Sequence, residues 1–428
     1  MRVLICCEFY HPSLGGVQVV MREIAERLVQ RGHEVVVATT RLPERRALVH
    51  NGVRIEEFDV AGNAVYGCTG EVERYREYVA AFDGDAILVK AAQQWTFDAL
   101  WPVLDRIRAR KVFVPCGFSG LKEPDYRDYY AQMPGVLKKF DHLIFYAERY
   151  RDIDFARDHG LTHWSVVPNG ASETEFSVPR DSGFRARYGI PEESFLFLTV
   201  GAYTGLKGHA EVAEAYALLA ADQPTVLILN GNRPVPRAAA LGGVQAARFT
   251  TRAVRALRRL GPVAAAKRAL EAFKPEPITR WTEHAGAQPG KRVLALELPR
   301  EALVQAYMAA DLFVFASHIE YSPLVLFEAA AAGTPFLSVP AGNAEEIARW
   351  TGAGMICPAP CDGRGYTRVD PRVLSMKMRE AMSDLQRLRE LGEAGRRAWR
   401  ERFTWATIAA QYEALLAPVD TRRSEHAT

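Results

Sequence analysis

The chain has 428 residues, of which 48% are apolar and 25% are charged, and its net charge is only +3. This composition is that of a globular protein, and the length is enough for two domains with separate hydrophobic cores. No run approaches eighteen apolar residues, and the first apolar run is too short for a signal peptide, so we expect neither a membrane-spanning helix nor export. The six cysteines are therefore expected to be reduced thiols.

The first half of the chain alternates short apolar runs with amphipathic stretches, which is typical of a parallel, doubly wound sheet. We predict strands at Val3–Cys7, Val35–Thr39, Ala86–Val89, Val112–Pro115 and His142–Phe145. We predict helices at Val17–Gln30, Phe97–Arg108 and Glu148–His159. Residues 1–175 should therefore form an N-terminal Rossmann-like domain, and the polar residues 176–193 should form a linker.

The same alternation restarts in the second half. We predict strands at Phe195–Val200, Val226–Leu229, Val293–Leu296, Leu312–Phe315, Phe336–Val339 and Met355–Cys357. An α/β architecture follows, with a second Rossmann-like domain over 194–402 that faces the first across a cleft. A helix within 403–417 is expected to dock back on the N-terminal domain, and residues 418–428 to form a disordered tail.

The positive charge is concentrated in one segment of the second half. Residues 233–292 hold 13 Lys and Arg against 3 Asp and Glu, so the rest of the chain has a net charge of −7. Four arginines are spaced to share one face of a helix: Arg248, Arg252, Arg255 and Arg259. This basic helix, in an insertion over about 233–290, fits an anionic membrane surface or lipid diphosphate, a solvated face, or a protein partner. No nucleic-acid recognition motif accompanies it.

Two carboxylates stand eight positions apart near the end of the second half. Glu320 follows the strand predicted at Leu312–Phe315, and Glu328 lies in the apolar helix expected after Pro323. Glu320 should therefore sit at the carboxyl end of a strand, which is where open α/β sheets bind ligands. A Glu on the buried side of a helix needs a partner, and sugar hydroxyls would serve.

Glycine-rich loops follow the first strand of each half. Gly15 and Gly16 open the first predicted helix, where backbone N–H groups can approach an anion. The loop is not G-x-G-x-x-G, which counts against a dinucleotide dehydrogenase. Gly201 and Lys207 occupy the corresponding loop of the second half, where a lysine could face a phosphate.

These motifs, in this order, resemble those of the retaining glycosyltransferases of family 4, which have the GT-B fold and the E-x7-E motif. The resemblance implies that Lys207 neutralises the donor diphosphate, that Glu320 approaches the transferring sugar, and that Glu328 holds the ribose. Lys207 and Glu320 would be the catalytic residues. The residues implied to bind the nucleotide-sugar donor are Gly15, Gly16, Gly201, Lys207, Ser322, Leu324 and Glu328.

The sequence departs from the family pattern at three places. The arginine that usually precedes the lysine is missing, and Ala202 or Tyr203 stands near its place. Pro323 interrupts the segment after Glu320 that grips the sugar in many relatives, and it has no N–H to donate. The usual histidine of the N-terminal domain is absent, with Cys116 or Ser119 near its place.

The resemblance implies retaining transfer from a nucleotide sugar to a glycan, lipid-linked or small-molecule acceptor, in surface-polysaccharide biosynthesis. We expect no metal and no other cofactor, because the resemblance implies a reaction that needs none. The expected location is the cytoplasm, with the basic segment favouring the inner face of the plasma membrane. Two alternatives stay open: a sugar-nucleotide C2-epimerase of the same fold, and an inactive, membrane-associated subunit that binds nucleotide sugars.

Overall fold

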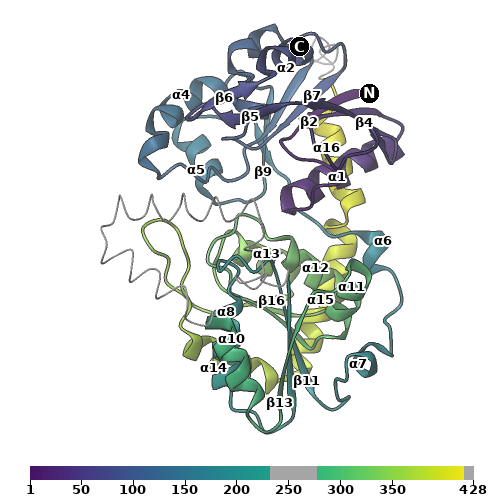
Figure 1. Cartoon of the computed structure of the whole chain (residues 1–428), viewed down its shortest axis with the longest axis vertical. Helices are drawn as coiled ribbons and strands as arrows, with labels where there is room; N and C mark the ends of the chain where they lie inside the picture. The colour runs from purple at the N-terminus through teal and green to yellow at the C-terminus, as the bar shows by residue number, and fades with distance from the viewer. Residues whose placement is uncertain (232–276, 419–428) are drawn as a thin grey trace, which may run out of the picture.

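The computed structural model describes residues 1–231 and 277–418, which form two α/β domains stacked along the long axis (Figure 1). The predicted arginine face (Arg248, Arg252, Arg255 and Arg259) and the tail after Pro418 lie outside the described residues. All six cysteines are free thiols.

The N-terminal domain is built on a mostly parallel sheet of order β10-β9-β8-β7-β1-β2-β4-β3, in which only β3 is antiparallel to its neighbour. Its strands are β1 (Arg2–Cys6), β2 (Glu34–Thr40), β3 (Val49–His50), β4 (Val53–Phe58), β7 (Ala86–Lys90), β8 (Arg110–Val114), β9 (His142–Phe145) and β10 (Trp164–Val166). A separate antiparallel hairpin is formed by β5 (Val60–Asn63) and β6 (Gly67–Gly70). The helices are α1 (Gly16–Gln30), α2 (Val72–Ala80), α3 (Trp95–Asp98), η1 (Trp101–Arg106), η2 (Pro124–Tyr126), α4 (Arg127–Leu137) and α5 (Arg151–Asp158).

The C-terminal domain is built on a fully parallel sheet of order β13-β12-β11-β14-β15-β16. Its strands are β11 (Phe195–Val200), β12 (Thr225–Asn230), β13 (Lys291–Leu296), β14 (Leu312–Phe315), β15 (Phe336–Ser338) and β16 (Gly354–Ile356). Its helices are α8 (His209–Leu218), α10 (Pro277–Gly286), α11 (Arg300–Ala309), α12 (Leu324–Ala332), α13 (Ala344–Thr351), α14 (Pro371–Met382) and α15 (Leu385–Arg402). Strands buried on both faces explain the continuous apolar runs in the sequence.

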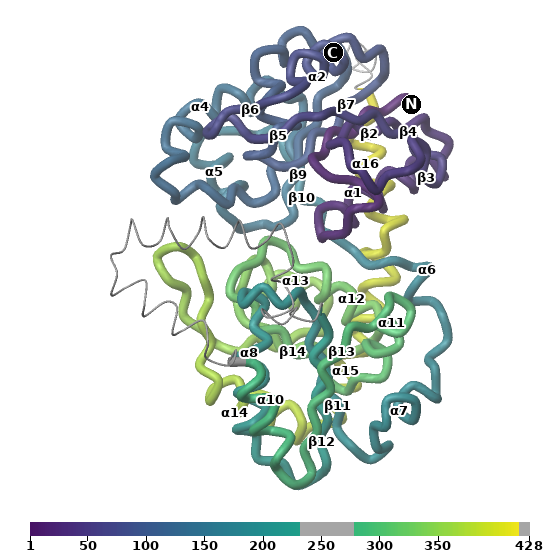
Figure 2. Tube along the Cα trace, in the orientation of Figure 1, coloured from purple at the N-terminus to yellow at the C-terminus, as the bar shows by residue number. Residues whose placement is uncertain are grey.

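Two segments connect the domains. The linker carries the short helices α6 (Glu173–Phe176) and α7 (Phe184–Arg187). After α15 the chain returns to the N-terminal domain as α16 (Trp405–Leu416), which packs along α1 and is drawn in yellow in Figure 2. The apolar face of α16 is buried in the same core cluster as β1 and α1. The N-terminal domain is therefore completed by residues from the far end of the sequence.

The strand order reverses at one point in each sheet, between β1 and β7 and between β11 and β14. At such a point the loops that leave adjacent strands diverge to opposite faces and leave a crevice at the carboxyl ends, where ligands bind. The loops that follow these four strands are therefore the ones to inspect for a site.

One predicted helix is wrong. The stretch Phe97–Arg108 is not a single helix, because α3 ends at Asp98 and the chain continues as the 3-10 helix η1. Pro102 lies at the start of η1, and a proline there cannot donate to the carbonyl four residues earlier, so a continuous α-helix is broken. Strand β4 was also missed, because Glu56 and Glu57 interrupt its apolar run.

Candidate active site

A cavity of about 420 Å³ lies between the two domains. Its wall contains all eight of the residues that the sequence analysis singled out for the donor site: Gly15, Gly16, Gly201, Lys207, Glu320, Ser322, Leu324 and Glu328. The loops that carry Gly15 and Gly16, Gly201 and Lys207, and Glu320 follow β1, β11 and β14. The structure thus brings these residues together at the two points where the strand order reverses.

Lys207 and Glu320 form an ion pair across two loops of the C-terminal domain. Lys207 Nζ lies 2.5 Å from Glu320 Oε1, which also accepts a hydrogen bond of 2.9 Å from Ser317 Oγ. The turn after Lys207 needs glycine, because Gly208 has φ of +75° and a Cβ there would lie 2.0 Å from the Ala316 carbonyl oxygen. The lysine is therefore presented by a tight turn that packs on the loop carrying its partner.

Glu328 lies on α12 and is held by Arg300, a residue that the sequence analysis did not identify. An Arg300 guanidinium nitrogen lies 2.6 Å from Glu328 Oε1, and the same side chain donates two bonds to Glu175 of the linker, of 2.9 and 2.7 Å. Burial alone would lower the pKa of this arginine, but Glu328 and Glu175 outweigh it and raise that pKa. Arg300 therefore stays charged and fixes the direction of the Glu328 carboxylate.

The loop between the two glutamates, together with Asn169 beside it, offers polar atoms without partners. Among the described residues, Ser322 Oγ and Asn169 Oδ1 are buried and have no hydrogen-bond partner, although both residues line the cavity. Pro323 precedes α12 as its N-cap, so the N–H groups of Leu324 and Val325 belong to the first turn, which has no intrahelical acceptors. Orphaned polar groups at a cavity wall are ready to bind a hydroxyl or a phosphate oxygen.

The glycine loop of the N-terminal domain closes the cavity from the opposite side. A Cβ on Gly16 would lie 4.0 Å from the Leu324 side chain, so the start of α1 faces the start of α12 directly. Gly15 is extended, with φ of 172°, so it does not require glycine for backbone conformation. The two helices point their N-terminal ends, which carry partial positive charge, at the same space.

The wall residues of the N-terminal domain that the sequence analysis did not place in the site include Lys90, Cys116 and Tyr146, although Cys116 was named near the place of the missing histidine. Ser119 is not in the wall and donates instead to Gln93 Oε1 at 3.0 Å. The signal that could have identified Lys90 is a lysine that ends an otherwise apolar strand, β7.

Tyr321 connects the site to the N-terminal domain. Its hydroxyl accepts a bond of 2.9 Å from Tyr146 N and donates to the buried carboxylate of Asp152. Burial raises the pKa of Asp152 to about 6, against the lowering effect of the hydrogen bonds from Tyr321 and the Gly117 N–H. Tyr150 donates to the Glu320 carbonyl oxygen at 2.7 Å. The loop that carries Glu320 is thus anchored on both domains.

The loop Ala341-Gly342-Asn343 packs against the segment that carries Tyr321. Gly342 has φ of +61°, and a Cβ there would lie 2.4 Å from the Tyr321 carbonyl oxygen. Asn343 donates from its backbone to Tyr321 and from its side chain to Tyr146, each at 2.9 Å. The structure therefore gives this loop a supporting role against Tyr321 and does not place it in the cavity wall.

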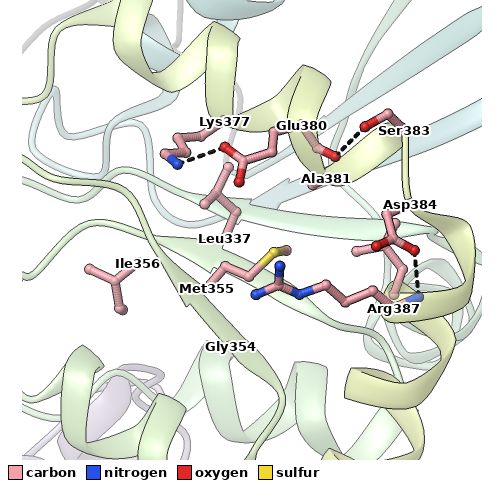
Figure 3. A pocket seen from close by; sticks show the side chains of 11 residues that line it. Leu337, Gly354, Met355, Ile356, Lys377, Glu380, Ala381, Ser383, Asp384 and Arg387 are labelled. Carbon is pink, nitrogen blue, oxygen red and sulfur yellow. Dashed lines mark hydrogen bonds and ion pairs between the residues drawn. The ribbon is translucent and has the colours of Figure 1, made fainter.

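A second cavity, of about 440 Å³, lies beside β16, α14 and α15, away from the domain interface (Figure 3). Its charged groups are partly satisfied by near neighbours: Lys377 pairs with Glu380 at 2.6 Å, and Asp384 accepts from Arg387 N at 2.9 Å. No residue singled out by the sequence analysis lines it. The interdomain cavity is therefore the better candidate for the active site.

Within residues 1–231 and 277–418, no cluster of three His, Cys, Asp or Glu side chains is arranged to hold a metal ion. In the same part of the chain, no helix combines the length and the apolar character needed to cross a bilayer.

Two family models match the chain. Residues 15–170 match the glycosyl transferase 4-like domain, and residues 280–397 match the glycosyl transferases group 1. Together the matched segments span more than half of the chain and include both domains.

Two curated relatives match over nearly the whole length. The chain is 22% identical to N-acetyl-alpha-D-glucosaminyl L-malate synthase of Bacillus anthracis, over 97% of this chain and 96% of that protein. It is 26% identical to D-inositol 3-phosphate glycosyltransferase of Kineococcus radiotolerans, over 96% of this chain and 92% of that protein.

Solved structures share the arrangement of the two domains. Sucrose-phosphate synthase from Thermosynechococcus elongatus superposes over the full length of both chains, with a TM-score of 0.69 and 17% identity. Anabaena HepE in complex with UDP superposes over 97% of this chain and 99% of that one, with a TM-score of 0.67 and 17% identity. The expected fold class is thereby confirmed as GT-B, and the chain belongs to the family 4 glycosyltransferases, which transfer a sugar from a nucleotide sugar.

Proposed function

We propose that this glycosyltransferase moves a sugar from a nucleoside diphosphate sugar to its acceptor with retention of configuration, and that it needs no metal ion or other cofactor. One observation carries the proposal. Lys207, Glu320 and Glu328 of the C-terminal domain line the same cavity as Gly15 and Gly16 of the N-terminal domain. A cation, two carboxylates and two facing helix ends are the groups that a diphosphate, a ribose and a sugar require.

In the proposed reaction Lys207 and the first-turn N–H groups of α12 hold the diphosphate. The bond between the sugar and the phosphate oxygen breaks through an oxocarbenium-like state, and the charge that grows on the leaving phosphate is stabilised by these positioned groups. The acceptor hydroxyl attacks from the same face and gives its proton to the leaving phosphate, which accounts for retention without a covalent enzyme intermediate. Glu320 lies beside the sugar and Glu328 binds the ribose hydroxyls.

The ion pair of Lys207 supports its proposed role on the diphosphate. Lys207 Nζ lies 2.5 Å from Glu320 Oε1, so the lysine is held in a defined position in the cavity wall. Such preorganisation lowers the cost of orienting the group during the reaction. The arginine missing from the family pattern is not replaced in the wall by Ala202 or Tyr203, which leaves Lys207 and the helix ends as the groups on the diphosphate.

The test is the variant Lys207→Ala. We expect at least a roughly 10²-fold lower rate of transfer, because one group that stabilises developing charge is worth about that much. Binding of the nucleoside diphosphate should also weaken when measured by calorimetry. Nucleoside diphosphates and nucleotide sugars are first screened by thermal shift, since a ligand that binds the folded state raises its stability.

Lys377→Ala is the matched control, because Lys377 lines the second cavity and not the interdomain one. It should leave both transfer and binding unchanged. Unchanged turnover in Lys207→Ala would overturn the site assignment. Retention is read from the anomeric configuration of the product by NMR, and activity after exhaustive chelation tests independence from metal ions.

Two alternatives give different results in the same assays. A C2-epimerase would convert the nucleotide sugar in the absence of any acceptor, so incubation with the donor alone separates it from a transferase. An inactive subunit would bind nucleotide sugars but show no turnover across an acceptor panel.

For the acceptor and the cellular setting, we propose surface-polysaccharide assembly in the cytoplasm, at the inner face of the plasma membrane. The support is the positive charge of residues 233–292 in the sequence. The relatives act, by their names, on L-malate and on D-inositol 3-phosphate, which favours a small acceptor. A lipid-linked acceptor and a small acceptor are therefore both to be assayed.

A further inference from the structure

Lys90 is a lysine at the cavity wall whose charge has no counter-ion. It ends β7, and the four residues before it, Ala86–Val89, are apolar and fully buried. Its own side chain is also buried, with 0% of the residue exposed. Burying an ammonium group is costly unless it is paired, so a structural reason or a ligand must account for it.

The described neighbours of Lys90 satisfy only part of its ammonium group. Lys90 Nζ lies 2.5 Å from the Tyr146 hydroxyl and 4.1 Å from the centre of the Tyr146 ring. No carboxylate of the described residues lies within 4.0 Å of Nζ. A lysine has three N–H donors, so this contact leaves donor capacity for an anion.

The other cations in the wall are already matched. Lys207 pairs with Glu320, and Arg300 pairs with Glu328. Among the lining residues that the structure describes, Lys90 is thus the one cation without a carboxylate partner. The cavity carries one positive charge that its own side chains do not balance.

Lys90 places that charge on the side of the cavity that the N-terminal domain forms, where we expect the acceptor. The lysine lies in the N-terminal domain, where the strand order reverses between β1 and β7, whereas Lys207 and the start of α12 serve the diphosphate from the other domain. Tyr146, which holds Lys90, stacks on Tyr321 with ring centres 5.4 Å apart, and Tyr321 adjoins Glu320. A group bound by Lys90 is therefore next to the place where the sugar is transferred.

We infer that Lys90 binds an acidic group of the acceptor, a phosphate or a carboxylate, and thereby selects anionic acceptors. The inference rests on the proposed transferase function and adds the chemical class of the second substrate. The unpartnered Ser322 Oγ and Asn169 Oδ1 in the same wall supply hydrogen bonds for hydroxyl groups. The acidic group can belong to a soluble acid or to a lipid phosphate, which the experiment separates.

The test is Lys90→Met, which keeps the length of the side chain and removes the charge. Acceptors are compared in matched pairs: a phosphorylated polyol with the free polyol, a hydroxy acid with its amide, and a polyprenyl phosphate with the polyprenol in detergent micelles. The wild-type protein should prefer the charged member of one pair by about 30-fold or more in kcat/KM, and Lys90→Met should abolish that preference. The pair that shows the effect identifies the source of the acidic group.

A control variant and a melting-temperature measurement test whether the effect comes from binding by Lys90 and not from a structural role of this lysine. Lys111→Met is the control, because Lys111 lies in the same domain, outside the cavity wall, and pairs with Asp141 at 3.6 Å. It should keep the preference. In the absence of ligands, Lys90→Met should unfold at the same or a higher temperature than the wild type, since it removes a buried charge without a counter-ion. A lysine with a merely structural role would instead lower the melting temperature and leave the preference intact.

The inference fails if the wild type prefers uncharged acceptors or if Lys90→Met keeps the preference. A separate experiment measures binding through the melting temperature and needs no turnover. With the nucleoside diphosphate saturating, inorganic phosphate should raise the melting temperature of the wild type and of Lys111→Met, but not of Lys90→Met. Equal shifts in all three proteins would overturn the Lys90 site even if the transferase proposal holds. If the wild type binds none of the nucleoside diphosphates, the result instead counts against the proposed function.

Discussion

Arg300 shows how one side chain can position another, here Glu328, which we propose to contact the donor. It is the first residue of α11, and its guanidinium group joins Glu328 of α12 to Glu175 of the linker. A carboxylate with a fixed direction can accept hydrogen bonds from both ribose hydroxyls. A buried carboxylate without a partner would instead pay a desolvation penalty and would turn freely. Arg300 is therefore a positioning residue in this proposal.

We expect Arg300→Met to raise the KM for the donor about tenfold and to change kcat little. The ribose contact is the same before and during the reaction, so its loss removes uniform binding. Steady-state kinetics with varied donor measure the two constants separately. Arg300→Lys should recover part of the effect, and Glu175→Gln, which leaves the Glu328 pair intact, should have a small one. A fall in kcat at unchanged KM would contradict this role.

At the scale of elements, two loops from different domains meet at Tyr321. The loop between β14 and α12 carries Tyr321, and the start of α5 carries Asp152, which accepts from the Tyr321 hydroxyl. Burial raises the pKa of Asp152 from 3.8 to about 6, so the folded state holds a proton that the unfolded chain releases at lower pH. The stabilising contribution of this proton is fully present below about pH 4 and is lost as the pH rises through about 6.

We expect Asp152→Asn to remove this dependence on pH. The wild type should lose up to about 3 kcal/mol of unfolding free energy relative to the variant between pH 4 and pH 7, since one pKa unit is worth about 1.4 kcal/mol. Urea denaturation at a series of pH values measures the difference. Burial also raises the pKa of Asp98 to about 6. Asp98 is present in both proteins, so its contribution to the pH dependence cancels in the comparison. Asp154→Asn, on the exposed side of α5, should retain the wild-type slope. Parallel curves for Asp152→Asn and wild type would contradict the assignment.

At the scale of the whole molecule, the charge is distributed unevenly. Residues 233–292 have a balance of +10, while the remainder of the chain has −7. A basic segment on an otherwise acidic protein is attracted to an anionic surface, by about 1 kcal/mol for each Lys or Arg near the lipid headgroups.

We therefore expect the protein to sediment with vesicles that contain anionic lipid and to stay in solution with purely zwitterionic vesicles. Replacing Arg248, Arg252, Arg255 and Arg259 together by Gln should weaken the binding strongly, and raising the salt concentration should have a similar effect because it screens the charges. A quadruple variant that binds as well as the wild type would rule out these arginines as the membrane contact.

Much of the fold follows from the sequence because its strands are local and strongly apolar. Strands β9, β11 and β14 have the predicted bounds, helix α16 lies within the predicted range 403–417, and most other strands differ by one or two residues. The split between α3 and η1 and the strand β4 were missed, because a proline in the first case and two glutamates in the second changed the local pattern. The motifs also identified eight residues of the cavity wall, because these residues lie in the segments that connect β1, β11 and β14 to the following helices, or in those helices.

By itself the sequence determined the α/β class, the two-domain organisation and the resemblance to family 4 glycosyltransferases, because these depend on short-range periodicity and on motifs at strand ends. Only the tertiary structure decided the partners within the site. Arg300 lies 28 residues before Glu328, Lys90 ends β7 whereas Tyr146 follows β9, and Asp152 meets Tyr321 from the other domain. No local pattern encodes such contacts, because they form only when both sheets and the return of α16 to the first domain bring distant segments together.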